Sequence, residues 1–201
     1  MSSIVSRPGS AALSPFRIEK IRQEAARLGV TLGSVEARFW HFLEIDGVLD
    51  AAAERQIDQT LAYGVPADAP AAGMVQVLVT PRPGTISPWS SKATDILRNS
   101  GLAQLKRIER GVAFRLLDPA GVPLAEAALK TVLPLLYDRM TEAVLPSLAD
   151  AAVLFRHVPP REMTAVDVLA GGRAALVAAN RDLGLALSDD EVDYLVEKDR
   201  K

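Results

Sequence analysis

Apolar and polar residues alternate in several stretches of the chain, a pattern typical of β-strands with one buried face. The alternation predicts strands over residues 35–45, 74–80 and 105–117. Residues 1–7 are predicted as a short edge strand and residues 141–145 as a weak last strand. These segments are enough for one sheet.

Between the strands, apolar residues recur at helical spacing. Helices are predicted over residues 15–28, over 49–61 with Asp50 as the cap, and from Pro88 to about residue 100. Residues 124–137 are predicted to form a fourth helix, which Pro134 should kink or shorten because proline cannot donate to a carbonyl one turn earlier.

Two of these junctions repeat one sequence. Arg-Pro-Gly-hydroxyl, then apolar-Ser-Pro-aromatic, occurs at residues 7–16 and at residues 82–89, once Ala11 and Ala12 are treated as an insertion. Serine followed by proline favours a helix N-terminus, and Pro-Gly favours a turn with a positive φ angle at glycine. The repeat predicts two halves that superpose, with a helix beginning at each Ser-Pro.

Each half reads strand, helix, strand, helix, over residues of about 1–65 and 74–148, with residues 64–73 as a loop between them. The prediction is an α+β domain over residues 1–150: a pseudo-two-fold antiparallel sheet with helices on one face. Residues 151–201 are predicted as a helical linker segment, with Gly184 ending one helix and a Ser188–Glu191 capping box opening the next.

Composition narrows the class of protein. The 201 residues are 49% hydrophobic and 24% charged, with a net charge of −2, so no bulk positive charge favours nucleic acid or an anionic membrane. The chain has no cysteine, no signal-peptide pattern and no apolar run of the ~20 residues that span a bilayer. We expect a cytoplasmic protein that binds neither nucleic acid nor membrane.

The stretch from Arg82 to Lys92 is the main candidate site. Its hydroxyls, its two cations and a helix N-terminus could face one anion or a partner, or the stretch could be only a capped turn; the glycine and lysine spacing of a phosphate-binding Walker loop is absent. The candidate interface residues are Arg82, Thr85, Ser87, Trp89, Ser90, Ser91 and Lys92. Of these, Arg82, Thr85, Ser90, Ser91 and Lys92 are expected to be exposed.

Other polar groups are weaker candidates. Asp138 and Arg139 could form a polar site, although a salt bridge is favoured. His41 and His157 are interpreted as structural or surface histidines, and residues 189–191 as a solvated helix start. No catalytic constellation and no metal-ligand spacing is complete.

A family resemblance adds to this interpretation. Residues 80–96 and the Arg-Ile-Glu-Arg-Gly-Val-Ala sequence of residues 107–113 resemble the N-terminal region of the large bacterial-type phosphoribosylformylglycinamidine synthase of purine biosynthesis. The resemblance covers nearly the whole chain and includes residues 12–17, 138–142, 172–176, 183–187 and 193–195.

The resemblance implies a parent enzyme, a ligase that uses ATP, magnesium and glutamine-derived ammonia to convert formylglycinamide ribonucleotide to its amidine. It implies a domain similar to a dimer of the small PurS subunit, then a linker, with the synthetase and glutaminase domains of the same enzyme as partners. Tyr137 departs from the histidine common in the family, which weakens a proton-transfer role there.

The chain ends at Lys201, before any synthetase or glutaminase sequence, so we expect a truncation or an excised piece without cofactors of its own. Three hypotheses follow. The first is a structural and docking portion of the synthase. The second is a stand-alone PurS-like subunit that recruits separate catalytic chains, and the third is a small phosphate-binding module.

Overall fold

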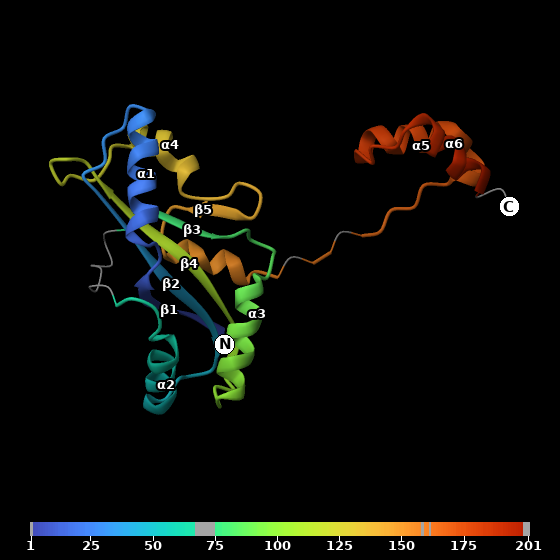
Figure 1. The fold of residues 1–201 in the computed structure, drawn as a ribbon. Helices are drawn as coiled ribbons and strands as arrows, with labels where there is room; N and C mark the ends of the chain where they lie inside the picture. The colour runs from blue at the N-terminus through green and yellow to red at the C-terminus, as the bar shows by residue number, and fades with distance from the viewer. Residues whose placement is uncertain (1, 67–74, 158, 161, 199–201) are drawn as a thin grey trace. The chain divides into compact units, whose positions relative to one another are not determined.

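The computed structural model describes residues 2–66, 75–157, 159–160 and 162–198. The predicted loop at residues 64–73 and the start of the strand predicted from residue 74 therefore lie mostly outside the described residues. The chain forms two compact units, residues 1–158 and 159–201 (Figure 1).

The first unit is built on a five-stranded antiparallel sheet with the order β1-β2-β4-β3-β5. The strands are β1 (Ser2–Ala11), β2 (Ser34–Asp46), β3 (Val77–Pro81), β4 (Leu105–Leu117) and β5 (Glu142–Leu145). The predicted α+β class with an antiparallel sheet is confirmed.

The two long central strands give the sheet its pseudo-two-fold arrangement. β2 and β4 have 13 residues each and pair along almost their whole length, with Trp40 opposite Gly111. When the two strands are matched residue by residue from their first residues, Trp40 again corresponds to Gly111. The pseudo-two-fold axis therefore passes through this pair. By the same alignment Phe39 corresponds to Arg110 and His41 to Val112.

The helices of the first unit are α1 (Pro15–Arg27), α2 (Ala51–Leu61), α3 (Pro88–Asn99) and α4 (Glu126–Val132). Ser14 and Ser87 are the N-caps of α1 and α3, so both Ser-Pro pairs begin helices as predicted. Asp50 caps α2, which is also confirmed. Pro134 lies in a 3₁₀ turn, η2 (Leu133–Leu135), which ends α4 early.

These helices cover one face of the sheet, as predicted (Figure 1). Alternate β2 residues point to that face and lie in two clusters, one with α1 and α4 and the other with α2 and α3. The opposite face is covered in part by a 3₁₀ helix, η3 (Ala149–Phe155), whose Ala151 and Leu154 are buried with Trp40 and Phe42. Because of this packing, the first unit extends beyond residue 150.

The first copy of the Arg-Pro-Gly repeat does not form the turn that its sequence suggests. Pro8 and Gly9 continue β1, with a register shift between Pro8 and Ala11. β1 is an edge strand, and an edge strand tolerates proline better than a central one because only one of its sides pairs with a neighbour. The insertion of Ala11 and Ala12 lies where β1 continues past the end of the corresponding strand β3.

Beside β4, a polar stripe on α3 takes the place of a neighbouring strand. β3 pairs only with residues 112–114 of β4, which leaves the N-terminal half of β4 without a neighbouring strand on that side. The Ser90 hydroxyl donates to the Ile108 carbonyl at 2.6 Å, and the Thr94 hydroxyl accepts from the Ile108 N–H at 3.2 Å. One turn further, Arg98 donates to the carbonyls of Leu105 and Lys106. The helix therefore caps an exposed strand edge.

The second unit contains α5 (Val168–Leu183) and α6 (Asp189–Lys198). They pack through Leu176, Val192 and Val196, and Gly184 ends α5 in the left-handed conformation that glycine adopts without strain. Ser188 and Glu191 form the predicted capping box. None of the described helices of the chain combines the length and the hydropathy needed to cross a bilayer.

Candidate functional site

The candidate site begins with a tight turn between β3 and α3. Thr85 donates its backbone N–H and its hydroxyl to the Arg82 carbonyl, at 3.1 and 2.6 Å. Gly84 has a φ angle of 86°, so the expected turn with a positive φ after Pro83 is present. The turn holds Arg82 and Thr85 at the surface.

Behind the turn, a buried carboxylate fixes the start of α3. Glu109 of β4 accepts hydrogen bonds from the backbone N–H and the hydroxyl of Ser87, at 3.2 and 2.9 Å. The same Ser87 hydroxyl oxygen accepts the N–H of Ser90 at 3.0 Å. Glu109 thus anchors the residue that caps the helix, and the turn leading to it is held at both ends.

A second turn, residues 138–142, lies beside the first. The backbone N–H of Arg82 donates to the Thr141 carbonyl at 3.2 Å, and its guanidinium donates to the Met140 carbonyl at 3.3 Å. Asp138 accepts hydrogen bonds from Met140 and Thr141. The structure therefore brings together the two segments that the sequence analysis selected separately.

The favoured salt bridge between Asp138 and Arg139 is not seen among the ion pairs of the described residues. The Asp138 carboxylate instead closes its own turn, and Arg139 is exposed.

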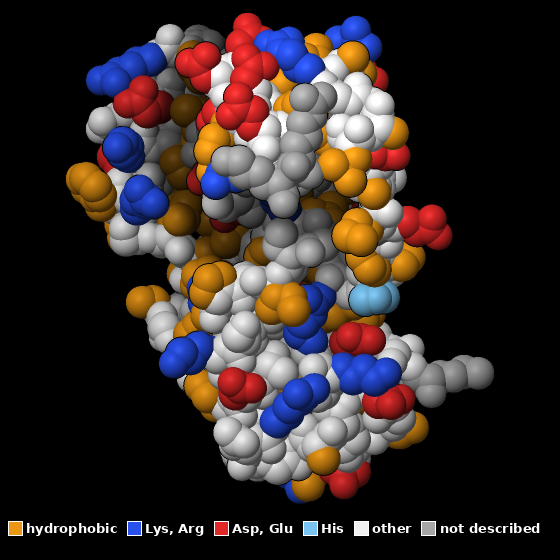
Figure 2. Space-filling model, turned by 90° about the vertical axis from the view of Figure 1, so that its right-hand side faces the viewer, with side chains coloured by type: hydrophobic (Ala, Val, Ile, Leu, Met, Phe, Trp, Pro, Cys, Tyr) orange, Lys and Arg blue, Asp and Glu red, His pale blue; other side chains and the backbone are white. Residues whose placement is uncertain are grey.

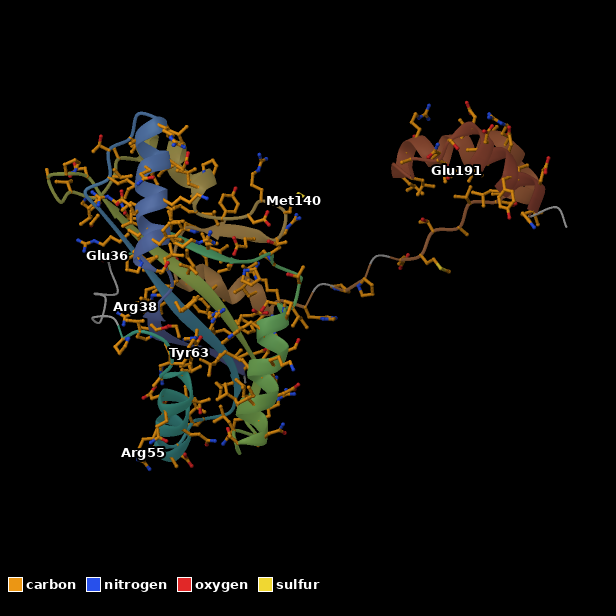
Figure 3. The ribbon with its side chains drawn as sticks, in the orientation of Figure 1. Glu36, Arg38, Arg55, Tyr63, Met140 and Glu191 are labelled. Atoms are coloured by element: carbon orange, nitrogen blue, oxygen red, sulfur yellow. The ribbon has the colours of Figure 1, made fainter. Side chains whose placement is uncertain are left out.

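The two turns line a groove of about 690 Å³. A smaller hollow of about 190 Å³ shares three of its lining residues and extends toward the pseudo-two-fold axis. The shared residues are Pro81, Ser87 and Glu142. Ile86 and Met140, 61% and 77% exposed, are the apolar side chains at the open end of the groove, and Met140 projects from the turn before β5 in Figure 3.

At the inner end of the groove, Arg110 is held between aromatic rings. Its guanidinium carbon lies 4.0 Å from the ring centre of Phe39 and 4.7 Å from that of Trp89, and one nitrogen donates to the Tyr63 hydroxyl at 3.2 Å. Cation–π contacts of this kind fix a guanidinium without neutralising it. Arg110 is half-buried and forms no ion pair within the described part of the chain.

His41 completes the cluster beneath Arg110. It is fully buried, its Nε2 lies 2.6 Å from the Tyr63 hydroxyl, and its Nδ1 has no partner among the described residues. Burial lowers the pKa of His41 to about 4, and the charge of Arg110 acts in the same direction. His41 is therefore a neutral structural histidine near neutral pH.

Most of the predicted interface residues are at the surface. Arg82, Thr85, Ser91 and Lys92 are exposed, while Ser87 and Trp89 are half-buried. The expectation for Ser90 was wrong, because this side chain is fully buried against β4.

Sequence reasoning missed Glu109 and Arg110 as parts of this site. Both lie in the 107–113 motif, but their partners are about 20 residues or more away along the chain. In the described residues, no group of three or more His, Asp or Glu side chains could hold a metal ion.

Comparison with protein families connects this site to a known enzyme. Residues 38–155, more than half of the chain, match the family model described as formylglycinamide ribonucleotide amidotransferase N-terminal. The chain belongs to this family. It therefore represents the N-terminal region of phosphoribosylformylglycinamidine synthase, an enzyme of purine biosynthesis. Both turns, the groove and the cluster of Arg110 with Phe39, His41, Tyr63 and Trp89 lie within the matched residues.

Proposed function

We propose that the chain serves as the structural and docking portion of phosphoribosylformylglycinamidine synthase, and that the surface from Arg82 to Lys92 contacts the synthetase domain. The parent reaction is the ATP- and glutamine-dependent conversion of formylglycinamide ribonucleotide to formylglycinamidine ribonucleotide. In this proposal the glutaminase is the other partner, and this portion supplies geometry rather than a reacting group.

One observation carries the proposal: the groove is exposed, yet its two turns are fixed from within. Arg82 is tied to residues 140 and 141, and Ser87 is tied to the buried Glu109. Exposed loops without such anchoring lose conformational entropy when they bind, whereas a fixed surface loses less. A surface built in this way is suited to docking a neighbouring domain.

ATP and magnesium would be bound by the synthetase domain in this proposal. The described residues offer no set of three carboxylate or histidine ligands for a metal ion, so no step of the reaction is assigned to them.

The test uses Arg82→Ala and Lys92→Ala, made both in this chain and in the full-length synthase. Both side chains are exposed, so the free energy of unfolding of this chain should change by only about 0–1 kcal/mol. Amidine synthesis by the full-length enzyme should fall. The matched control is Arg55→Ala, an exposed arginine on α2 at a distance from Met140 and the groove (Figure 3).

Unchanged synthesis by both variants, at equal amounts of folded enzyme, would overturn the docking role. Restored synthesis on mixing this chain with separate synthetase and glutaminase chains would support the docking role and would also show that covalent linkage is not needed.

A further inference from the structure

The carboxylates and the arginines around the groove differ in the partners that they have within the unit. Its carboxylates are engaged from within the unit: Glu109 by Ser87, Glu142 by the N–H of residue 138, and Asp138 by residues 140 and 141. Glu109 also lies 4.0 Å from the Arg107 guanidinium, so its charge is paired within the unit, while Glu142 and Asp138 accept hydrogen bonds from neutral N–H or hydroxyl groups.

The arginines of the same surface lack a charged partner. Arg82, Arg110 and Arg139 form no ion pair within the described part of the chain, although many other arginines of the first unit do. The Arg82 guanidinium donates to a neutral carbonyl, and that of Arg110 donates to a hydroxyl. The groove surface therefore presents guanidinium groups that no carboxylate of the described residues pairs with.

This positive character is local. In the view of Figure 2, Lys and Arg side chains are interspersed with Asp and Glu, and the chain as a whole carries a net charge of −2. General attraction of anions to the protein is thus weak, and selection for negative charge has to come from the groove itself.

Size and apolar lining indicate what kind of anion fits. The inner hollow of about 190 Å³ beside Arg110 admits one side chain, and the outer groove of about 690 Å³ continues it along an extended path. Ile86 and Met140 expose apolar surface beside Arg82. A free inorganic anion would use the guanidinium groups but would leave this apolar lining unused.

We propose that the groove binds an extended acidic segment of a partner domain, with one carboxylate on Arg110 and an apolar side chain between Ile86 and Met140. Arg82 and Arg139 pair with further carboxylates at the rim. This inference rests on the proposed docking function and adds to it the chemistry of the segment that docks. Arginine suits this role because its planar guanidinium binds a carboxylate with two parallel hydrogen bonds.

The first experiment titrates the full 201-residue chain with the peptide acetyl-Asp-Leu-Glu-Leu-Asp-amide and with its neutral counterpart acetyl-Asn-Leu-Gln-Leu-Asn-amide. Trp89 lies beside Arg110 and reports binding by fluorescence, while amide shifts in NMR spectra locate the peptide. The acidic peptide should bind about tenfold more tightly than the neutral one, a difference that shrinks as salt is added.

The arginine variants test the assignment of the carboxylates. Arg110→Met keeps an unbranched apolar stem between Phe39 and Trp89, and it should weaken the acidic peptide about tenfold. Arg55→Met, on α2 outside the groove, should change nothing (Figure 3). Equal binding of the two peptides, an unaffected Arg110→Met, or amide shifts away from residues 81–89 and 138–142 would each overturn the proposal.

Inorganic phosphate is the competing ligand. Displacement of the peptide by phosphate at the peptide's own concentration would indicate a small-anion site and would also overturn the proposal. A loss of amidine synthesis in Arg82→Ala or Lys92→Ala, together with equal binding of the two peptides, would leave the docking function standing and reject only the acidic segment.

Discussion

Removal of the Ser90 hydroxyl tests whether a helix side chain replaces a missing strand at the edge of β4. Ser90 is fully buried and donates to the Ile108 carbonyl at 2.6 Å. In Ser90→Ala that carbonyl loses its donor and stays in a dry environment. Leaving a buried polar group without its partner costs about 1–3 kcal/mol, so we expect a loss of free energy of unfolding of that size.

The neighbouring Ser91 supplies a matched control. Ser91 is exposed on the same helix turn, and Ser91→Ala should change the stability by no more than about 0.5 kcal/mol. Thr94→Val removes the acceptor for the Ile108 N–H at nearly constant volume and should cost about 1–3 kcal/mol as well. The double variant should be non-additive, because both hydroxyls serve one residue.

Urea unfolding followed by tryptophan fluorescence measures these effects, since both tryptophans, Trp40 and Trp89, lie in the first unit. Thermal unfolding gives a second measure, with a melting temperature lowered by about 2–4 °C per kcal/mol for a protein of this size. If Ser90→Ala unfolds at the same urea concentration as Ser91→Ala, the polar stripe of α3 does not stabilise the edge of β4, and the reasoning is wrong.

Three further predictions concern single residues. The buried His41 has a pKa lowered from 6.5 to about 4, so the free energy of unfolding should fall by about 3 kcal/mol in total as the pH drops from above 6.5 toward 4. His41→Gln should flatten the pH dependence of the urea midpoint over that range, and an unchanged pH dependence would contradict this prediction. Gly111→Ala places a methyl group 2.8 Å from the Val79 carbonyl oxygen and should destabilise the first unit by about 1–3 kcal/mol in urea unfolding. An unchanged urea midpoint would contradict this prediction and would show that β3 and β4 can move apart at little cost. The hydrogen bonds from Ser188 lower the pKa of Glu191 from 4.5, so the cap of α6 should be intact at pH 4.5 and should open only as the pH falls below that value. A midpoint at or above 4.5 in the NMR titration of the Ser188 amide would argue against the cap.

Local signals in the sequence were sufficient for most of the elements. Serine before proline predicts the starts of α1 and α3, because capping and a fixed proline φ act within one helix turn. Alternation over residues 105–117 gives the bounds of β4 as the structure has them. These effects depend on neighbouring residues, so the sequence displays them directly.

The remaining features depend on contacts between distant segments. Ile96 is apolar but 57% exposed, while Ser90 and Thr94 are buried because the helix lies against a strand edge that needs polar partners. Pro8 and Gly9 have the sequence of a turn, and pairing with β2 holds them in a strand instead. Tertiary pairing overrides local preference in both cases.

The pseudo-two-fold axis at Trp40 and Gly111 also determines which pairs of side chains can meet there. In a dimer of two identical chains, a residue beside the axis faces its own copy, so an arginine would meet an arginine. Here the two halves belong to one chain, and the corresponding positions hold Phe39 and Arg110, whose guanidinium lies over the phenyl ring. A substitution at either position changes the centre of the sheet once rather than twice, so the two sides of the axis can acquire different chemistry.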